Sequence, residues 1–165
     1  MSAAGGRPMI HYHAAEYYLP HASPMVLLEQ VLEVGEEHAR CAVMVNSDGV
    51  LAPFLDAQGA LPGWYGIELM AQAIGVWSGW HACQSAQSPQ LGMLLGGRAI
   101  HCELPAFPAG SKLLVSVQQL LKDEKLASFE CEISIDNVRI AQGRLNTYQP
   151  DQQEIIQLTT LRGDA

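Results

Sequence analysis

A nearly uninterrupted apolar stretch, GWYGIELMAQAIGVWS from Gly63 to Ser78, constrains the fold of this chain more than any other feature. Its length corresponds to a helix of about four turns, and Glu68 is the one charged residue within it. An ionised carboxylate that leaves water costs several kcal/mol unless it is paired or protonated. We therefore expect a buried helix in which Glu68 has either a chemical task or a polar partner.

The composition is typical of one compact domain with a sizeable core. The chain has 165 residues, 48% of them apolar, and a formal net charge of −8. We expect a single domain over residues 1–165, with a core at about 19–148, an N-terminal arm and a polar C-terminal tail. The nine basic residues are scattered, whereas nucleic acids and anionic membranes bind clustered Lys and Arg, so neither is an expected partner.

The cysteines and the N-terminus indicate a cytoplasmic protein. The four cysteines, Cys41, Cys83, Cys102 and Cys131, show no CxxC spacing, and the N-terminal sequence lacks the apolar core of a signal peptide. The predicted helix is interrupted by polar residues and falls short of the roughly 20 apolar residues that cross a bilayer. We therefore expect reduced thiols and no membrane span.

Strand-like sequence lies on both sides of the predicted helix. The run Met25–Val34 is apolar and β-branched, and Ala39–Val45 alternates apolar and polar residues as a half-buried strand does. A loop over Ser47–Pro62 leads to the helix, which begins beside Pro62 and ends near Cys83. Four more strands are predicted at Leu91–Leu104, Lys112–Leu121, Leu126–Ile135 and Val138–Tyr148.

The order of these elements predicts an α+β fold. Tight turns at Lys122–Lys125 and Asp136–Asn137 join the last three strands. Two strands, one long apolar helix and a four-strand antiparallel meander form a pattern in which the sheet wraps around the central helix. A doubly wound parallel sheet needs several strong helices. One side of the helix would still need cover, so we expect a dimer with a homologous subunit.

Three segments resemble the hot-dog β-hydroxyacyl-ACP dehydratases. PGWYGIELMAQA, Pro62–Ala73, is similar to their helix-start motif of Pro-Gly, four residues, Glu, then Met-Ala-Gln. LPHASPMVLLEQVLEV, Leu19–Val34, is similar to their Leu-Pro-His turn and first strand, and ELPAFPAGSKLLVSVQQLL, Glu103–Leu121, to their paired-proline turn and following strand. The resemblance implies a dimeric hot-dog fold and a 3-hydroxyacyl-ACP or 3-hydroxyacyl-CoA dehydratase of fatty-acid or aryl-polyene lipid synthesis, without cofactor or metal.

The resemblance also implies roles for particular residues. In that family a helix glutamate works with a loop histidine of the opposite subunit, which removes the α-proton while the carboxyl group helps the hydroxyl leave as water. Glu68 matches the acid by position. The stretch Asn46–Ile67 contains no histidine, and the family's two histidine positions hold Phe54 and Gln58. The implied assembly is a homodimer, or a heterodimer in which a histidine-bearing hot-dog subunit completes the site around Glu68.

Four further residues are candidates for the same site. Gln72 lies one turn after Glu68, where its amide can orient that carboxylate, bind the substrate hydroxyl or bond to the backbone. Free N–H groups of Gly63 and Trp64 at the helix start can polarise a thioester carbonyl, although Gly63 can equally serve close packing. Asp56 is a candidate general base, or a residue that shapes its turn.

Three functions remain open on the sequence alone. The first is the dehydratase, the second is a thioesterase that uses Glu68 or Asp56 to activate water, and the third is a non-catalytic subunit or acyl-chain binding module. The acidic net charge suits docking of an acidic carrier protein only if Arg98, Lys112 or Arg144 cluster on one face. The histidines lack a metal-binding spacing, so a metal site is not expected.

Overall fold

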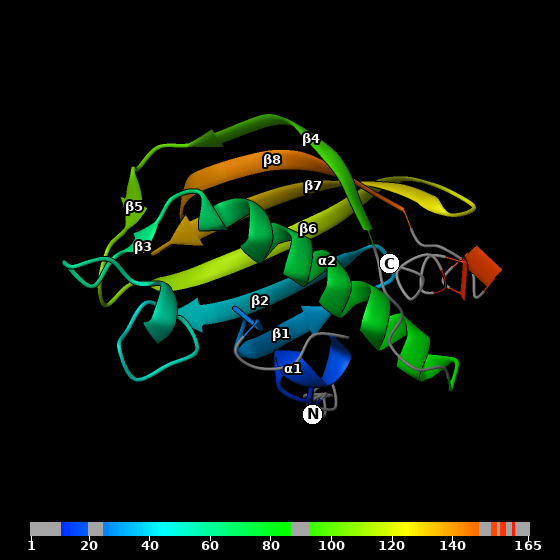
Figure 1. The fold of residues 1–165 in the computed structure, drawn as a ribbon, viewed down its shortest axis with the longest axis horizontal. Coiled ribbons are helices and arrows are strands. Elements are labelled where there is room, and N and C mark those ends of the chain that lie inside the picture. Colours follow the sequence, from blue (N-terminus) through cyan, green and yellow to red (C-terminus); the bar gives the residue numbers. More distant parts are fainter. Residues whose placement is uncertain are drawn as a thin grey trace, which may run out of the picture.

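The central helix of the computed structural model, α2 (Tyr65–Gln84), lies across one face of an antiparallel sheet (Figure 1). The structure describes residues 11–19, 25–86, 93–148, 153–154, 156–157 and 160. The Pro-His of the Leu-Pro-His motif and the predicted strand start at Leu91 lie outside these residues. Within them, an α+β fold with the sheet curved around one long helix is confirmed.

Six strands form the main sheet. Their order is β1-β2-β6-β7-β8-β4, and all neighbouring pairs are antiparallel. Their bounds are β1 Gln30–Val34, β2 His38–Met44, β4 Met93–Cys102, β6 Lys112–Asp123, β7 Leu126–Ile135 and β8 Val138–Tyr148. The smaller elements are α1 Ala15–Tyr18, the 3₁₀ turn Ala52–Phe54 (η1), and the paired strands β3 Leu61–Pro62 and β5 Ala106–Phe107.

The predicted four-strand meander is wrong in one respect. β6, β7 and β8 are consecutive neighbours, but β4 pairs with β8 at the far edge, and β6 pairs with β2. Hairpin sequences specify their own local pairing, whereas the partner of β4 depends on how the sheet closes around the helix. The Asp136–Asn137 hairpin turn is confirmed, since both residues have positive φ, 50° and 65°.

The first predicted strand is shorter than its sequence indicates. Residues 25–29 lie outside β1, which begins at Gln30. The backbone N–H of Leu27 and the carbonyl of Met25 instead bond to the side chain of Gln72 on α2, at 2.8 Å each. These groups bond to the helix and so are not available to a neighbouring strand.

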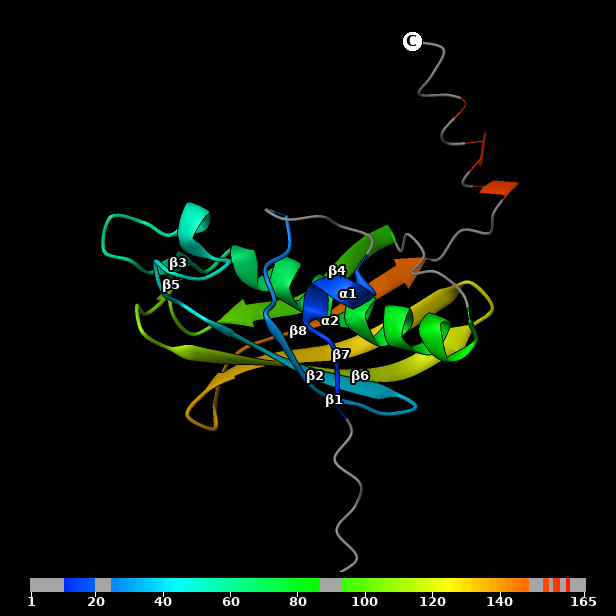
Figure 2. The same cartoon turned by 90° about the horizontal axis from the view of Figure 1, so that it is seen from below.

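The core lies between α2 and the concave face of the sheet. On the helix, Leu69, Met70, Ala73 and Val76 are buried at the three- and four-residue spacing of one helical face. On β7, alternate residues from Phe129 to Ile133 are buried while the residues between them are not. Figure 2 shows α1 and α2 on the same side of the sheet, and neither of these two helices covers its other face.

The described helices include none with the length and apolar character needed to cross a membrane.

The N-terminal segment packs directly on the second half of α2. A Cβ placed on Gly79 would overlap the backbone carbonyl of Tyr18, whereas one on Gly75 would meet only the mobile end of Leu19, at 2.8 Å from Cδ2. The absence of a side chain at Gly79 therefore permits this contact between α1 and α2.

We expect Gly79→Ala to lower the free energy of unfolding by about 1–3 kcal/mol, because the backbone of α1 has to move. Gly75→Ala is the matched control in the same helix, since a leucine side chain can rotate away and alanine favours helix. Urea denaturation of both variants measures the difference. Equal stability of the two would contradict the packing described here.

Candidate active site

Glu68 lies in the first turn of α2, where the positive end of the helix dipole favours a carboxylate. The expectation that it is buried is wrong for the single chain, because its side chain is exposed. The apolar stretch around it is buried where it meets the sheet and the N-terminal segment, and Glu68 lies on the remaining, open side of the helix. The sequence pattern identified the residue correctly as an exception but did not show which side of the helix it faces.

Gln72 fixes the position of Glu68. Its side chain is 2% exposed, and it is the buried polar side chain of the described core. Its Nε2 donates to Glu68 Oε1 at 3.1 Å and to the Met25 carbonyl at 2.8 Å, while its Oε1 accepts the Leu27 N–H at 2.8 Å. Both amide hydrogens are thus in use, and the amide orients Glu68 and bonds to the backbone at the same time.

The start of α2 is held by the turn before β5. The expectation of a free N–H on Gly63 is wrong, because it donates to the Pro105 carbonyl at 2.9 Å. A Cβ on Gly63 would lie 3.0 Å from that oxygen and 3.2 Å from the Leu104 carbonyl oxygen, so glycine allows this close packing without a shift of the neighbouring backbone. Trp64 follows with its side chain 73% exposed.

An apolar groove runs beside the first half of α2. Its volume is about 310 Å³, within the range of small-molecule sites. Trp64 and Ile67 on the helix form one wall, and Ile100 and Cys102 on β4 form the other. Glu68 is not one of the residues that line this groove, but it lies four residues after Trp64, a spacing that makes the two side chains neighbours on the helix surface. The contribution of β4 to this groove was not predicted, because the sequence does not show that β4 pairs with β8 and so lies next to the start of α2.

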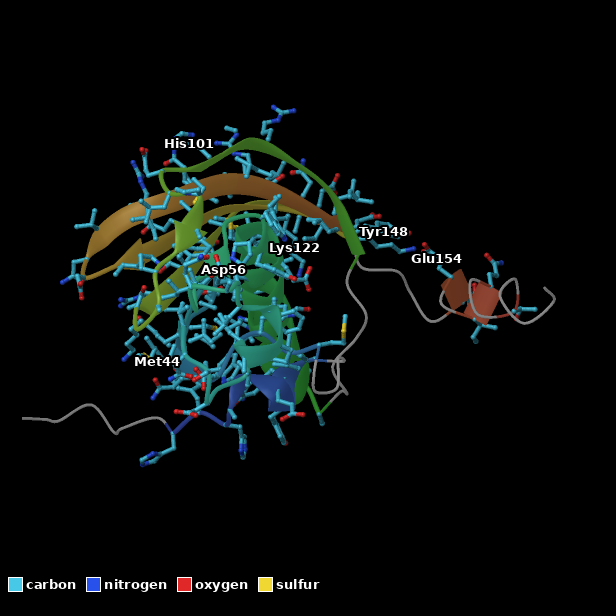
Figure 3. All side chains as sticks on the ribbon, turned by 60° about the vertical axis from the view of Figure 1, so that its left-hand side comes forward. Met44, Asp56, His101, Lys122, Tyr148 and Glu154 are labelled. Atoms are coloured by element: carbon cyan, nitrogen blue, oxygen red, sulfur yellow. The ribbon has the colours of Figure 1, made fainter. Side chains whose placement is uncertain are left out.

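The loop between β2 and α2 carries Phe54 and Asp56. The Phe54 ring is half-buried and packs 5.4 Å from the ring of Tyr65. Asp56 Oδ1 accepts the N–H groups of Gln58 at 2.9 Å and Ala60 at 3.0 Å, which is turn-forming chemistry. Figure 3 labels Asp56 in this loop. Of the predicted site residues, Gln72 is in contact with Glu68. Asp56 instead uses its Oδ1 to hold the turn in which it lies.

Other reactive groups lie apart from Glu68. Among the described residues, Glu68 hydrogen bonds to no histidine, and no cluster of three His, Cys, Asp or Glu side chains is arranged to hold a metal. The four cysteines are free thiols. Burial raises the pKa of the Cys41 thiol, and likewise that of Cys131, to about 12, so neither is a thiolate nucleophile at neutral pH.

A long central helix wrapped by an antiparallel sheet, with an exposed carboxylate in its first turn, is the architecture of a hot-dog protein. The chain belongs to the ApeP-like family, described as ApeP dehydratase, which matches residues 13–158. It is also similar to a chain of the dehydratase heterocomplex ApeI:P from Xenorhabdus doucetiae, with 55% identity over 90% of this chain and 99% of that one, and a TM-score of 0.85. The enzyme class is thus that of the dehydratases, which are hydro-lyases.

More distant solved structures share the fold alone. A mutant of the phenylacetic acid degradation protein PaaI from Thermus thermophilus is 16% identical over 73% of this chain and 92% of its own, with a TM-score of 0.55. A hypothetical thioesterase of Streptococcus pneumoniae, solved with coenzyme A, is 14% identical over 74% and 89%, with a TM-score of 0.56. The hot-dog fold predicted from the sequence is confirmed.

We expect Gln72→Leu to lower the free energy of unfolding by about 1–3 kcal/mol, because the buried N–H of Leu27 loses its acceptor. Gln84→Leu, at the exposed end of the same helix, is the control and should change stability by no more than about 0.5 kcal/mol. Chemical denaturation measures both. A Gln72→Leu protein as stable as the control would show that these hydrogen bonds contribute nothing.

Proposed function

We propose that this chain is the acid-bearing subunit of a 3-hydroxyacyl-thioester dehydratase, acting on chains carried by ACP or CoA in fatty-acid or aryl-polyene lipid synthesis. The observation that carries the proposal is Glu68, which is exposed, held by the buried Gln72 amide, and one helical turn after Trp64 on the wall of an apolar groove. A fixed carboxyl group beside an acyl-sized groove is what proton donation to a leaving hydroxyl requires. The free cysteines suit a reducing, cytoplasmic location.

The base is proposed to come from a second hot-dog subunit. Phe54 fills the family's histidine position with a packed aromatic ring, and no histidine bonds to Glu68 among the described residues. The open side of α2 exposes Trp64, and the edge strand β4 exposes Leu94 and Ile100, which supports a covering partner. The similar chain from Xenorhabdus doucetiae is part of a structure described as a dehydratase heterocomplex, which favours a heterodimer over a homodimer.

In the proposed reaction each proton has a defined destination. The partner's histidine takes the α-proton of the 3-hydroxyacyl thioester, and the electron pair of that C–H bond forms the double bond. The C–O bond at carbon 3 breaks as the protonated carboxyl group of Glu68 gives its proton to the hydroxyl, which leaves as water. The product is an enoyl thioester, and the elimination requires no cofactor or metal.

The roles of the helix-start residues follow from their contacts. We assign Gln72 to positioning of Glu68 and Trp64 to the groove wall that holds the acyl chain. Gly63 supports the helix start through Pro105, which leaves the Trp64 N–H as the candidate donor to the thioester carbonyl. For Asp56 the hydrogen bonds of Oδ1 favour a turn-forming role over a catalytic one.

We expect Glu68→Gln to lower kcat of the heterocomplex by about 10²–10⁴-fold, the usual contribution of a general acid, with assembly unchanged. Enoyl absorbance measures dehydration, and gel filtration measures assembly. Asp56→Asn is the control, because it keeps the turn-forming oxygen and should retain full activity.

Three results would contradict the proposal. Full dehydratase activity of this chain as a homodimer would remove the need for a partner's histidine. Release of free thiol from the acyl thioester, lost in Asp56→Asn and not in Glu68→Gln, would instead identify a thioesterase. A complex whose activity survives Glu68→Gln would make this chain a non-catalytic subunit.

A further inference from the structure

Glu29 is a second carboxylate near the hydrogen bonds of Gln72, and its polar groups bond to three other residues. Its backbone N–H donates to the Ala42 carbonyl at 3.2 Å, and its backbone carbonyl accepts the N–H of Ala15 at 3.1 Å. Its side-chain Oε1 accepts the N–H of Met44 at 2.8 Å. Glu29 therefore lies where the N-terminal segment, β1 and β2 meet.

The bond from Met44 takes the place of a bond within the sheet. Ala42 and Met44 are alternate residues of β2, so their backbone N–H groups point toward the same neighbouring strand. The register of β1 with β2 ends at the Gln30–Ala42 pair, before Met44 is reached. A part-buried N–H without an acceptor is costly. The carboxylate of Glu29 supplies the acceptor that the backbone of β1 does not.

This side-chain acceptor allows the segment before β1 to bond to α2 instead of to the sheet. The Leu27 N–H and the Met25 carbonyl each bond to Gln72 at 2.8 Å, and the same amide donates to Glu68 Oε1 at 3.1 Å. If this segment joined the sheet, β2 would gain a backbone acceptor, but Gln72 would lose its bonds to the segment. The carboxylate of Glu29 thus favours the arrangement in which Glu68 is fixed.

The Glu29 carboxylate has no ion-pair partner within the part of the chain that the structure describes, so hydrogen bonding accounts for its position. Its second oxygen, Oε2, faces the start of the loop that follows β2, where a Cβ on Gly49 would lie 3.2 Å away. Glu29 therefore lies between the segment that holds Gln72 and the loop that leads to α2.

We propose that Glu29 is a positioning residue for Glu68 and acts through residues 25–28 and the amide of Gln72. This rests on the proposed role of Glu68 as the acid of the dehydratase, and it adds a second carboxylate that does not touch the substrate. Because Glu29 works as a hydrogen-bond acceptor, glutamine can replace it, whereas leucine, which has a similar size and no acceptor, cannot.

The first test compares substitutions of Glu29 in the assembled enzyme. Glu29→Leu should lower kcat for dehydration about 10–100-fold, because a misplacement of about 1 Å can cost 10²-fold. KM for the acyl thioester should stay unchanged, because Glu29 does not line the groove. Glu29→Gln should keep kcat within about twofold of wild type, because a neutral acceptor weakens the bond without removing it.

Two further variants support this comparison. Glu29→Asp has a carboxylate one methylene shorter, so its kcat should lie between those of Glu29→Gln and Glu29→Leu, and it serves as the test if the leucine variant does not fold. Glu33→Leu is the matched control, because it makes the same change on β1 at a carboxylate that pairs with His38 and Arg40. It should retain the wild-type kcat.

A double variant distinguishes positioning of Glu68 from a general effect on the fold. In the Glu68→Gln background, Glu29→Leu should cause no further loss of kcat, because the group that it positions is already replaced. A further loss would show that Glu29 acts elsewhere and would overturn the proposal. Wild-type kcat in both Glu29→Leu and Glu29→Asp, or equal losses in Glu29→Gln and Glu29→Leu, would overturn it as well.

Hydrogen exchange tests the positioning without an assay of dehydration. In the full chain, the Leu27 N–H and the side-chain amide of Gln72, followed by NMR, should exchange about tenfold faster in Glu29→Leu than in wild type. Both should exchange at wild-type rates in Glu29→Gln and Glu33→Leu. Unchanged exchange in Glu29→Leu would overturn the proposal. Faster exchange in a chain whose complex does not dehydrate would support the positioning and contradict the proposed function.

Discussion

The buried amide of Gln72 is the interaction on which the site depends, because it joins the helix and Glu68 to a segment that is more than forty residues away in the sequence. Through the Met25 carbonyl and the Leu27 N–H it attaches the segment before β1 to the helix, and through Glu68 it fixes a carboxylate on the open face. A buried amide with unmet hydrogen bonds would be costly, so the segment and the carboxylate are held together. The Glu68 carboxyl group on the open side of the helix is therefore held in place before any partner or substrate arrives.

Elements defined by local patterning were predictable, whereas those defined by long-range contacts were not. The alternation in β7 and the Asp136–Asn137 turn specify their hairpin locally, and the apolar run specifies α2. The position of β4 beside β8 and the short pair β3–β5 depend on segments that meet only after folding. The late start of β1, at Gln30, follows from bonds between the preceding segment and Gln72, more than forty residues away, which no local period encodes.

The same distinction between local pattern and long-range contact applies to the residues of the candidate site. Glu68 was identifiable because a charge in an apolar helix is rare, and the missing histidine because Phe54 occupies its place in the sequence. The predicted burial of Glu68 failed because apolar residues on the open side of a helix look the same in sequence as those facing the sheet. The N–H of Gly63 is bonded to Pro105, a partner brought close only by the β3–β5 pairing. The sequence therefore singled out Glu68 but did not show the hydrogen bonds around it.

The edge strand β4 combines requirements that usually conflict. An exposed edge with apolar side chains such as Leu94 and Leu95 invites pairing with another chain, and proteins normally protect such edges with charge, bulges or cover. Here the bulge at Ala99 interrupts the edge, Arg98 adds charge on the outer face, and Ile100 turns to the groove. These features restrict any partner to one that matches an irregular, charged edge, so the irregularity favours a particular second subunit over indiscriminate self-association. The dehydratase proposed here, in which Glu68 is the acid and the base comes from another chain, requires that kind of selectivity.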